Sequence, residues 1–223
     1  MSERSAGVPP AVAGASRPRY GEVTIRNRGR LPHWEMESGT YFVTFRLGDS
    51  LPQSALTKLE VEAAQASGDD KSEKKKALLR RIEMYLDRGA GACLLAQPAI
   101  AKTVADAIHH LDGRSYRLIA WVVMPNHVHL VVRLLPGKKL ASAMHSLKSY
   151  TSEEANRILG RRGIFWQREY YDHLIRNASE LERSVSYVLA NPLKANLKGW
   201  KWVGCCGPEA RNTAGGDAGA TGA

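Results

Sequence analysis

The sequence predicts an α+β fold: a ferredoxin-like antiparallel sheet with helices packed against it. The expected strands and helices follow the order β-α-β-β-α-β-α, which suits such a sheet. Two of the strands are separated only by a Pro-Asn break, and so short a connection makes an antiparallel hairpin. With 223 residues, 43% of them hydrophobic, the chain is long enough for one domain with a real core.

In the first half, residues 40–47 have high strand propensity. A charged helical stretch follows at about residues 54–88. It is interrupted at Ser67-Gly-Asp-Asp-Lys71, so we expect two helices, or a helical hairpin with a soft middle. Residues 98–110 predict a further helix, because the segment begins with a proline and continues with helix formers.

In the second half, residues 116–124 and 127–134 predict the two strands of the hairpin, with Pro125-Asn126 as the turn. Residues 140–159 show helical spacing of apolar side chains. A short apolar anchor at residues 164–167 precedes a short strand at residues 170–175. The last helix spans residues 181–190, with a cap in Asn177-Ala-Ser-Glu180 and a stop at Asn191-Pro192.

The two ends of the chain differ in composition from its middle. Residues 1–19 and 204–223 are rich in small and polar residues and are expected to be disordered. The domain therefore spans residues 20–203, and residues 54–95 form a helical insertion within it.

Composition narrows the class of protein. The formal net charge of +10 is spread over the whole chain, which favours a polyanionic partner such as a nucleic acid. Three cysteines, two of them adjacent, do not make a disulfide framework, so a reducing cytoplasm is the expected compartment, in association with the nucleoid if DNA is the partner. No apolar run approaches a membrane span, and no signal peptide is evident.

The most informative feature is the pair His127 and His129 on the second strand of the hairpin. Side chains two apart on a strand point to the same face, so the two imidazoles are held side by side. Neutral imidazole is a common metal ligand, and the pair predicts a metal site that needs a third ligand from elsewhere.

Tyr187 and Asn191 lie four residues apart on the last helix, hence on one face of it. Asn191 can offer a carbonyl oxygen to a hard cation. A phenol beside a metal-bound phosphate is a candidate nucleophile, which is the interpretation of Tyr187. Tyr150, Tyr170 and Tyr171 are rival nucleophiles, but none of them has an Asn one turn further on.

Three runs of residues carry a specific resemblance. Trp121-Val-Val-Met-Pro-Asn-His-Val-His-Leu130 resembles the HUH motif (His, bulky hydrophobe, His) of single-tyrosine transposases. The run from Phe165 to Asn177, followed by Tyr187-Val-Leu-Ala-Asn-Pro-Leu-Lys194, resembles the REP-associated tyrosine transposases, which are IS200-like. Arg30-Leu-Pro-His-Trp-Glu35 and Tyr41-Phe-Val-Thr-Phe-Arg46 fit the same family.

The resemblance implies an HUH endonuclease type of fold and metal-dependent cleavage and rejoining of single-stranded DNA. His127 and His129 match the metal-binding pair of the family, Tyr187 its catalytic tyrosine, and Asn191 the polar residue that completes the metal site. Cleavage would leave a 5′-phosphotyrosine and a free 3′-OH. The resemblance implies Mg²⁺ or Mn²⁺, whereas ligand softness alone favours Zn²⁺, Mn²⁺ or Ni²⁺.

The expected partner is single-stranded or hairpin DNA of the REP kind, bound by a monomer or a homodimer. Several cations and one indole between the His strand and the Tyr helix predict a DNA-binding groove, in which cations follow phosphates and rings stack on bases. They are Lys148, Arg157, Arg161, Arg162, Trp166, Arg168 and Arg176. Arg26, Arg28 and Arg30 suggest an additional arm on DNA.

Three other functions compete with a transposase. A non-catalytic DNA-binding regulator derived from a transposase would share the charge, although the intact His pair, Tyr187 and Asn191 favour retained chemistry. A histidine-triad nucleotide hydrolase would need a third His where Val131 stands. Replication initiators and relaxases use the same metal motif but tend to be larger.

Overall fold

The computed structural model describes residues 24–28, 31–66 and 70–206. The predicted disorder of residues 1–19 lies outside the described part of the chain, as do residue Arg30 and residues 207–223 of the predicted tail. No helix within the described residues is long and apolar enough to cross a membrane.

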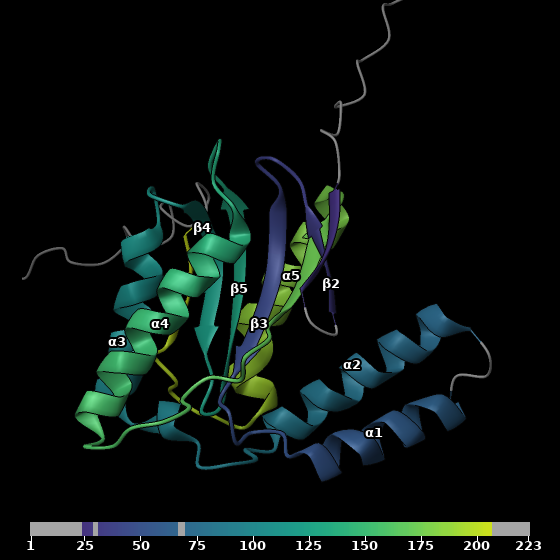
Figure 1. Ribbon diagram of the computed structural model, residues 1–223, viewed down its shortest axis with the longest axis horizontal. Helices are drawn as coiled ribbons and strands as arrows, with labels where there is room; N and C mark the ends of the chain where they lie inside the picture. Colours follow the sequence, from purple (N-terminus) through teal and green to yellow (C-terminus); the bar gives the residue numbers. More distant parts are fainter. Residues whose placement is uncertain (1–23, 29–30, 67–69, 207–223) are drawn as a thin grey trace, which may run out of the picture.

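A five-stranded antiparallel sheet forms the centre of the molecule (Figure 1). Its strand order is β6-β3-β5-β4-β7, and its first four strands have the order of a ferredoxin-like fold. The strands are β3 (Thr40–Arg46), β4 (Tyr116–Val123), β5 (His127–Leu134), β6 (Tyr171–Ile175) and β7 (Val203–Cys205). The predicted α+β class is confirmed, and so is the β4–β5 hairpin, closed by the Met124 amide donating to the His127 carbonyl over 2.8 Å.

The helices divide between the two faces of the sheet (Figure 1). α3 and α4 pack on one face, and α5 packs on the other. α1 and α2 form a separate antiparallel hairpin that projects from one end of the sheet. Their bounds are α1 (Gln53–Ala66), α2 (Lys71–Asp87), α3 (Pro98–Leu111), α4 (Leu140–Ile158) and α5 (Ala178–Lys194), with a 3₁₀ turn at Leu94–Ala96.

Alternation along the strands assigns each side chain to a face. On β5, Val128, Leu130 and Val132 join the large core under α3 and α4. His127 and His129 therefore point to the opposite face, which α5 covers. On β3, Phe42 and Thr44 share the face of the imidazoles, whereas Phe45 points into the large core.

α5 begins at Ala178, three residues before the predicted start at 181, and it ends later than predicted. The predicted cap is confirmed: the Asn177 side chain accepts from the Glu180 amide (2.9 Å), and the Glu180 carboxylate accepts from the Arg176 amide, one residue before the cap (2.8 Å). The predicted stop at Asn191-Pro192 is wrong, because the helix continues through Pro192 to Lys194. Asn191 is thus inside the helix, one full turn beyond Tyr187.

Three further strands were not predicted. β1 (Thr24–Arg28) and β2 (Leu31–Glu35) form a separate two-stranded sheet that includes Arg26 and Arg28. β7 pairs with β4, opposing Cys205 to Ala120 and Gly204 to Trp121. The ordered chain therefore extends past the predicted boundary at residue 203.

Candidate active site

The two imidazoles of β5 lie in contact and out of reach of solvent. His127 and His129 are each 0% exposed, and their Nε2 atoms are 3.0 Å apart. Burial, followed by the positive charge of Arg46, lowers the pKa of His127 to about 3, and burial lowers the pKa of His129 well below its usual value. Both rings are therefore neutral at pH 7, which is the form that binds a metal.

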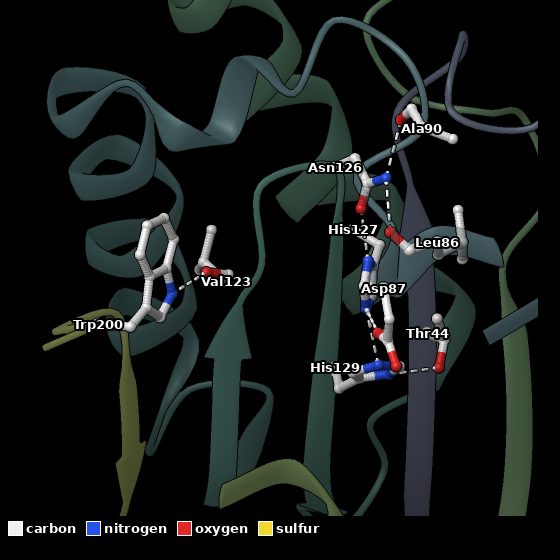
Figure 2. A network of polar contacts seen from close by, with 9 residues as sticks. All are labelled: Thr44, Leu86, Asp87, Ala90, Val123, Asn126, His127, His129 and Trp200. Carbon is white, nitrogen blue, oxygen red and sulfur yellow. Dashed lines mark hydrogen bonds and ion pairs between the residues drawn. The ribbon is translucent and has the colours of Figure 1, made fainter. Parts of the chain in front are cut away.

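Hydrogen bonds fix how the two rings are presented (Figure 2). The Asn126 amide nitrogen donates to the carbonyls of Leu86 (3.0 Å) and Ala90 (2.8 Å), so its oxygen faces His127 and accepts from Nδ1 over 2.7 Å. His127 Nε2 is then an acceptor. His129 Nδ1 lies 2.8 Å from the Thr44 hydroxyl, which can donate or accept and so fits either tautomer of His129.

This arrangement fits a divalent metal ion. Two imidazole nitrogens on one ion, each about 2.0–2.1 Å from it, stand about 3 Å apart when they occupy adjacent positions. The observed 3.0 Å separation matches that value. Each Nδ1 atom also has an oxygen partner, as metal-binding histidines usually do.

The structure brings Tyr187 to the imidazole pair. Its ring lies edge-on to the His129 ring, with centroids 5.3 Å apart, and Phe42 stacks on His129 at 5.4 Å. The Nζ atom of Lys194 lies 4.8 Å from the Tyr187 ring centroid. The phenol and both imidazoles belong to the same chain, so an arrangement in cis needs no second copy.

Tyr187 and Asn191 carry buried polar atoms without hydrogen-bond partners among the described residues. They are the Tyr187 hydroxyl and both amide atoms of Asn191, whose side chain is fully buried. Glu83 and Asn191 nevertheless lie close enough to affect the phenol. Burial, then the negative charges of Glu83 and Asp87, raise the pKa of Tyr187 well above its usual value. Buried polar atoms are normally paired, so these atoms point to a bound group.

Two carboxylates of α2 complete the surroundings, and the sequence analysis missed both. Glu83 and Asp87 are four residues apart and so share one helix face. Burial raises the pKa of Glu83 to about 7 and that of Asp87 to about 6. Their spacing on a charged helix was the available signal, but nothing in the sequence shows that α2 folds back onto the His strand.

The residues predicted to line a DNA-binding groove do not gather around this site. Lys148 and Arg157 belong to α4, which covers the other face of the sheet. Lys148 donates to the carbonyls of Gln167 and Arg168, and Arg157 pairs with Glu154. Trp166 is 5% exposed and donates to the Thr151 hydroxyl, so its ring packs in the core and does not offer a face for base stacking.

The remaining predicted cations are exposed at different ends of the sheet. Arg161 and Arg162 lie in the loop after α4. Arg176 follows β6 where Ile175 pairs with Thr40, which is the end of β3 far from His127. Arg168 is nearest to the imidazoles, because the preceding Gln167 amide donates to the Arg46 carbonyl and Arg46 pairs with His127.

Arg46 is a cation that the sequence analysis did not assign to the site. It lies on the same face of β3 as Thr44, opposite His127 in the strand register. Its Nε atom is buried and has no hydrogen-bond partner among the described residues. Burial lowers its pKa, while the negative charge of Glu169 acts against that shift.

An open depression leads to the phenol. It has a volume of about 450 Å³, and its lining includes Phe42, Glu83, Tyr171 and Tyr187. Of the rival tyrosines, Tyr171 lies on the same face of the sheet as the imidazoles, and burial raises its pKa to about 12. Tyr150 is 54% exposed on α4, on the opposite side of the sheet.

Comparison with known proteins agrees with this site. Residues 95–191 match the model of the family described as "Transposase IS200 like", a segment that contains both imidazoles, Tyr187 and Asn191. This segment, which is less than half of the chain, is similar to the IS200-like transposases.

The chain is also similar to REP-associated tyrosine transposases. It is 31% identical over 88 residues to the REP-associated tyrosine transposase of Escherichia coli (strain K12), covering 39% of this chain and 48% of that protein. A relative from Haemophilus influenzae with a corresponding name is 27% identical over 89 residues, covering 35% of this chain and 51% of that protein. The chain thus matches about half the length of these relatives.

Among solved structures, a REP-associated tyrosine transposase bound to a REP hairpin is similar with a TM-score of 0.49 and 19% sequence identity. The similarity covers 79% of this chain and 82% of that one.

Proposed function

We propose that this protein is a metal-dependent endonuclease and strand transferase that acts on single-stranded hairpin DNA through Tyr187. The observation that carries the proposal is the contact between the Tyr187 ring and the buried imidazole pair. A phenol held against two neutral imidazoles is suited to attack a phosphodiester whose oxygen is bound to a metal ion.

His127 and His129 would hold the ion, with Asn191 as a further oxygen donor from α5. Mg²⁺ or Mn²⁺ is the expected ion, since both accept oxygen ligands and phosphate. Such an ion supplies Lewis acidity, drawing electron density from phosphorus through a non-bridging oxygen. Burial and the negative charges of Glu83 and Asp87 keep the Tyr187 phenol protonated. The positive charge of the ion would offset those negative charges and so lower the pKa of the phenol.

The chain's own residues account for the remaining steps. The Tyr187 oxygen forms a bond to phosphorus, while the bond from phosphorus to the 3′-oxygen breaks. The products are a 5′-phosphotyrosine and a 3′-OH, so the proton lost by the phenol is balanced by the proton gained at the 3′-oxygen. Attack by a second 3′-OH reverses the step and joins strands without ATP, because the phosphotyrosine conserves the bond energy.

Positive side chains near the phenol would hold the DNA. Arg46 and Lys194 both lie at the site, and a guanidinium with an unpaired nitrogen suits a phosphate oxygen. The exposed cations Arg161, Arg162, Arg168 and Arg176 remain proposed contacts for more distant parts of the hairpin.

A covalent-adduct assay tests the proposal. Wild-type protein with Mn²⁺ or Mg²⁺ is expected to form an adduct with a labelled hairpin oligonucleotide that survives denaturing electrophoresis. Tyr187→Phe should abolish the adduct and retain DNA binding, whereas Tyr171→Phe, which removes a phenol from the same face, should retain it. An adduct that persists in Tyr187→Phe would move the role to another residue. Binding without any adduct in the wild type would favour a non-catalytic regulator.

A further inference from the structure

The α1–α2 hairpin lies outside the family-matched segment 95–191, yet its end reaches the imidazole pair. Asp87 is the last residue of α2. Its Oδ1 atom stands 3.8 Å from His127 Nε2, which is an acceptor because Nδ1 donates to Asn126 and which lies 3.0 Å from His129 Nε2. Figure 2 shows Asp87 beside the two rings.

The same Asp87 oxygen is buried and has no hydrogen-bond partner among the described residues. An unpaired carboxylate oxygen away from water is costly unless a cation or a donor satisfies it. His127 Nε2, 3.8 Å away, is itself an acceptor because Nδ1 carries the proton donated to Asn126, so it cannot satisfy this oxygen. Two acceptors that face each other at this distance call for a cation between them.

The position of Asp87 is tied to the His strand. The Asn126 amide nitrogen binds the carbonyls of Leu86 and Ala90, which flank Asp87 in sequence, and the Asn126 oxygen binds His127. One side chain therefore holds the end of α2 and the orientation of His127 together. This coupling keeps the carboxylate close to Nε2 without a direct bond between them.

We propose that Asp87 is a metal-binding residue, and that α2 thereby supplies an acidic ligand to the ion held by His127 and His129. The proposal rests on the metal-dependent function proposed above. A carboxylate is a hard, charged donor, so it favours Mg²⁺ or Mn²⁺ more strongly than the neutral amide of Asn191 does. The described residues contain no group of three His, Cys, Asp or Glu side chains already at ligand spacing, so the Asp87 side chain turns toward the imidazoles when the ion binds.

Direct measurement of Mn²⁺ binding to the full chain, by calorimetry and by electron paramagnetic resonance, tests the proposal without using activity. Asp87→Asn should weaken Mn²⁺ binding by about tenfold or more. Even the loss of a residue that only hydrogen-bonds to a metal ligand lowers metal affinity by about 10–100-fold. Glu83→Gln removes the same charge one turn away on α2. It is the matched control and should weaken binding less than about threefold, because a carboxyl with a pKa of about 7 carries only part of its charge at pH 7.

The outcomes separate this inference from the proposed function. If His127→Ala abolishes Mn²⁺ binding and Asp87→Asn leaves it unchanged, the role of Asp87 is overturned and the His site stands. If His127→Ala also leaves binding unchanged, the proposed metal dependence itself fails. Equal losses in Asp87→Asn and Glu83→Gln would reduce Asp87 to a general electrostatic influence and would overturn ligation.

A second variant tests whether Asp87 binds the metal or only supports the fold, because a purely structural residue would not change the preference for one metal over another. Asp87→His replaces the hard oxygen donor with a third imidazole, so Zn²⁺ affinity should rise relative to Mn²⁺ affinity. An unchanged ratio would overturn the proposal. Thermal melting without metal serves as the folding control. Asp87→Asn should melt at or above the wild-type temperature, because it removes a buried, unpaired charge.

Discussion

The two faces of the sheet are built on opposite principles. The face under α3 and α4 is apolar, and its buried polar groups are paired: the Tyr116 hydroxyl donates to the Ile108 carbonyl over 2.8 Å, and the Trp166 indole to Thr151 over 2.9 Å. The face under α5 holds a smaller apolar cluster around two buried imidazoles.

The unpaired buried atoms concentrate on the second face. Of the seven unpaired buried side-chain atoms in the described residues, five belong to Arg46, Asp87, Tyr187 and Asn191. Arg46, Asp87 and Tyr187 lie at the imidazole pair, and Asn191 lies beside Tyr187. Buried groups are normally paired, so the difference between the faces supports the proposal of a ligand site under α5.

The largest expected effect comes from two phenylalanines of β3 that point to opposite faces. Phe45 packs on Trp166 with ring centroids 4.8 Å apart and is 1% exposed, so Phe45→Ala should cost about 3–5 kcal/mol of stability. Phe42→Ala should cost less, because Phe42 sits in the smaller cluster, but it should strongly reduce adduct formation by releasing the His129 and Tyr187 rings. Denaturant unfolding and the adduct assay measure both effects. Equal stability losses would contradict the distinction between the faces.

The next effect is a pH dependence at Glu83. In the folded protein the pKa of Glu83 is raised to about 7, mainly by burial. The folded state therefore keeps a proton on Glu83 that the unfolded state releases near pH 4–5. The resulting stability is fully present below pH 4 and is lost as pH rises toward 7. Relative to wild type, Glu83→Gln should therefore gain about 1–3 kcal/mol between pH 4 and pH 7 in metal-free buffer. Denaturant unfolding across this range measures the gain, and a constant difference between the two proteins would refute the shift.

A smaller effect comes from two buried phenols. Tyr116→Phe should cost about 1–2 kcal/mol, because it leaves the Ile108 carbonyl without its donor. Tyr187→Phe should be neutral or stabilising in the metal-free protein, because the hydroxyl it removes has no partner among the described residues. Chemical denaturation of the two variants side by side is the measurement. A clear loss in Tyr187→Phe would mean that its hydroxyl is satisfied after all.

The smallest expected effect tests which face binds DNA. Arg46→Met should weaken binding of a single-stranded hairpin by about fivefold, the value of one charge-assisted hydrogen bond at the low end of its range. Arg157→Met is the control on the other face, where the guanidinium already pairs with Glu154 at 2.8 Å. Fluorescence anisotropy at fixed salt compares them. A larger loss in Arg157→Met would place the DNA against α4.

The order of elements and the His-bearing hairpin could be predicted from the sequence, because both depend on local patterns. Strand propensity and a two-residue turn define β4 and β5, and Asn177 with Glu180 defines the start of α5. β7 was missed because three residues near a Gly-rich tail carry little strand signal, and only pairing with β4 stabilises them. The end of α5 was misplaced because a proline in the last turns removes only one helical hydrogen bond, the one to the Val188 carbonyl, and the helix can continue past it: the Ala195 amide still donates to the Asn191 carbonyl.

Only those parts of the site that lie on one strand or one helix could be predicted from spacing in the sequence. His127 with His129, and Tyr187 with Asn191, each share a face by periodicity alone. Glu83 and Asp87 could not be added, because their approach depends on how α2 lies against the sheet. Trp166 was assigned to a groove by its neighbours in sequence, whereas its packing on Phe45 and its hydrogen bond to Thr151 place it in the core.

The Asn126 amide has a consequence for how this protein could be altered. This one side chain binds both the end of α2 and the His127 ring, so the position of the α1–α2 hairpin and the tautomer of His127 depend on each other. Excising residues 54–90 would leave that amide free to flip, and an amide presenting its NH₂ group would force the imidazole beside it to exchange its proton between nitrogens. Removing the two helices would therefore change which ring nitrogen of His127 carries the proton, although His127 lies more than thirty residues further along the chain.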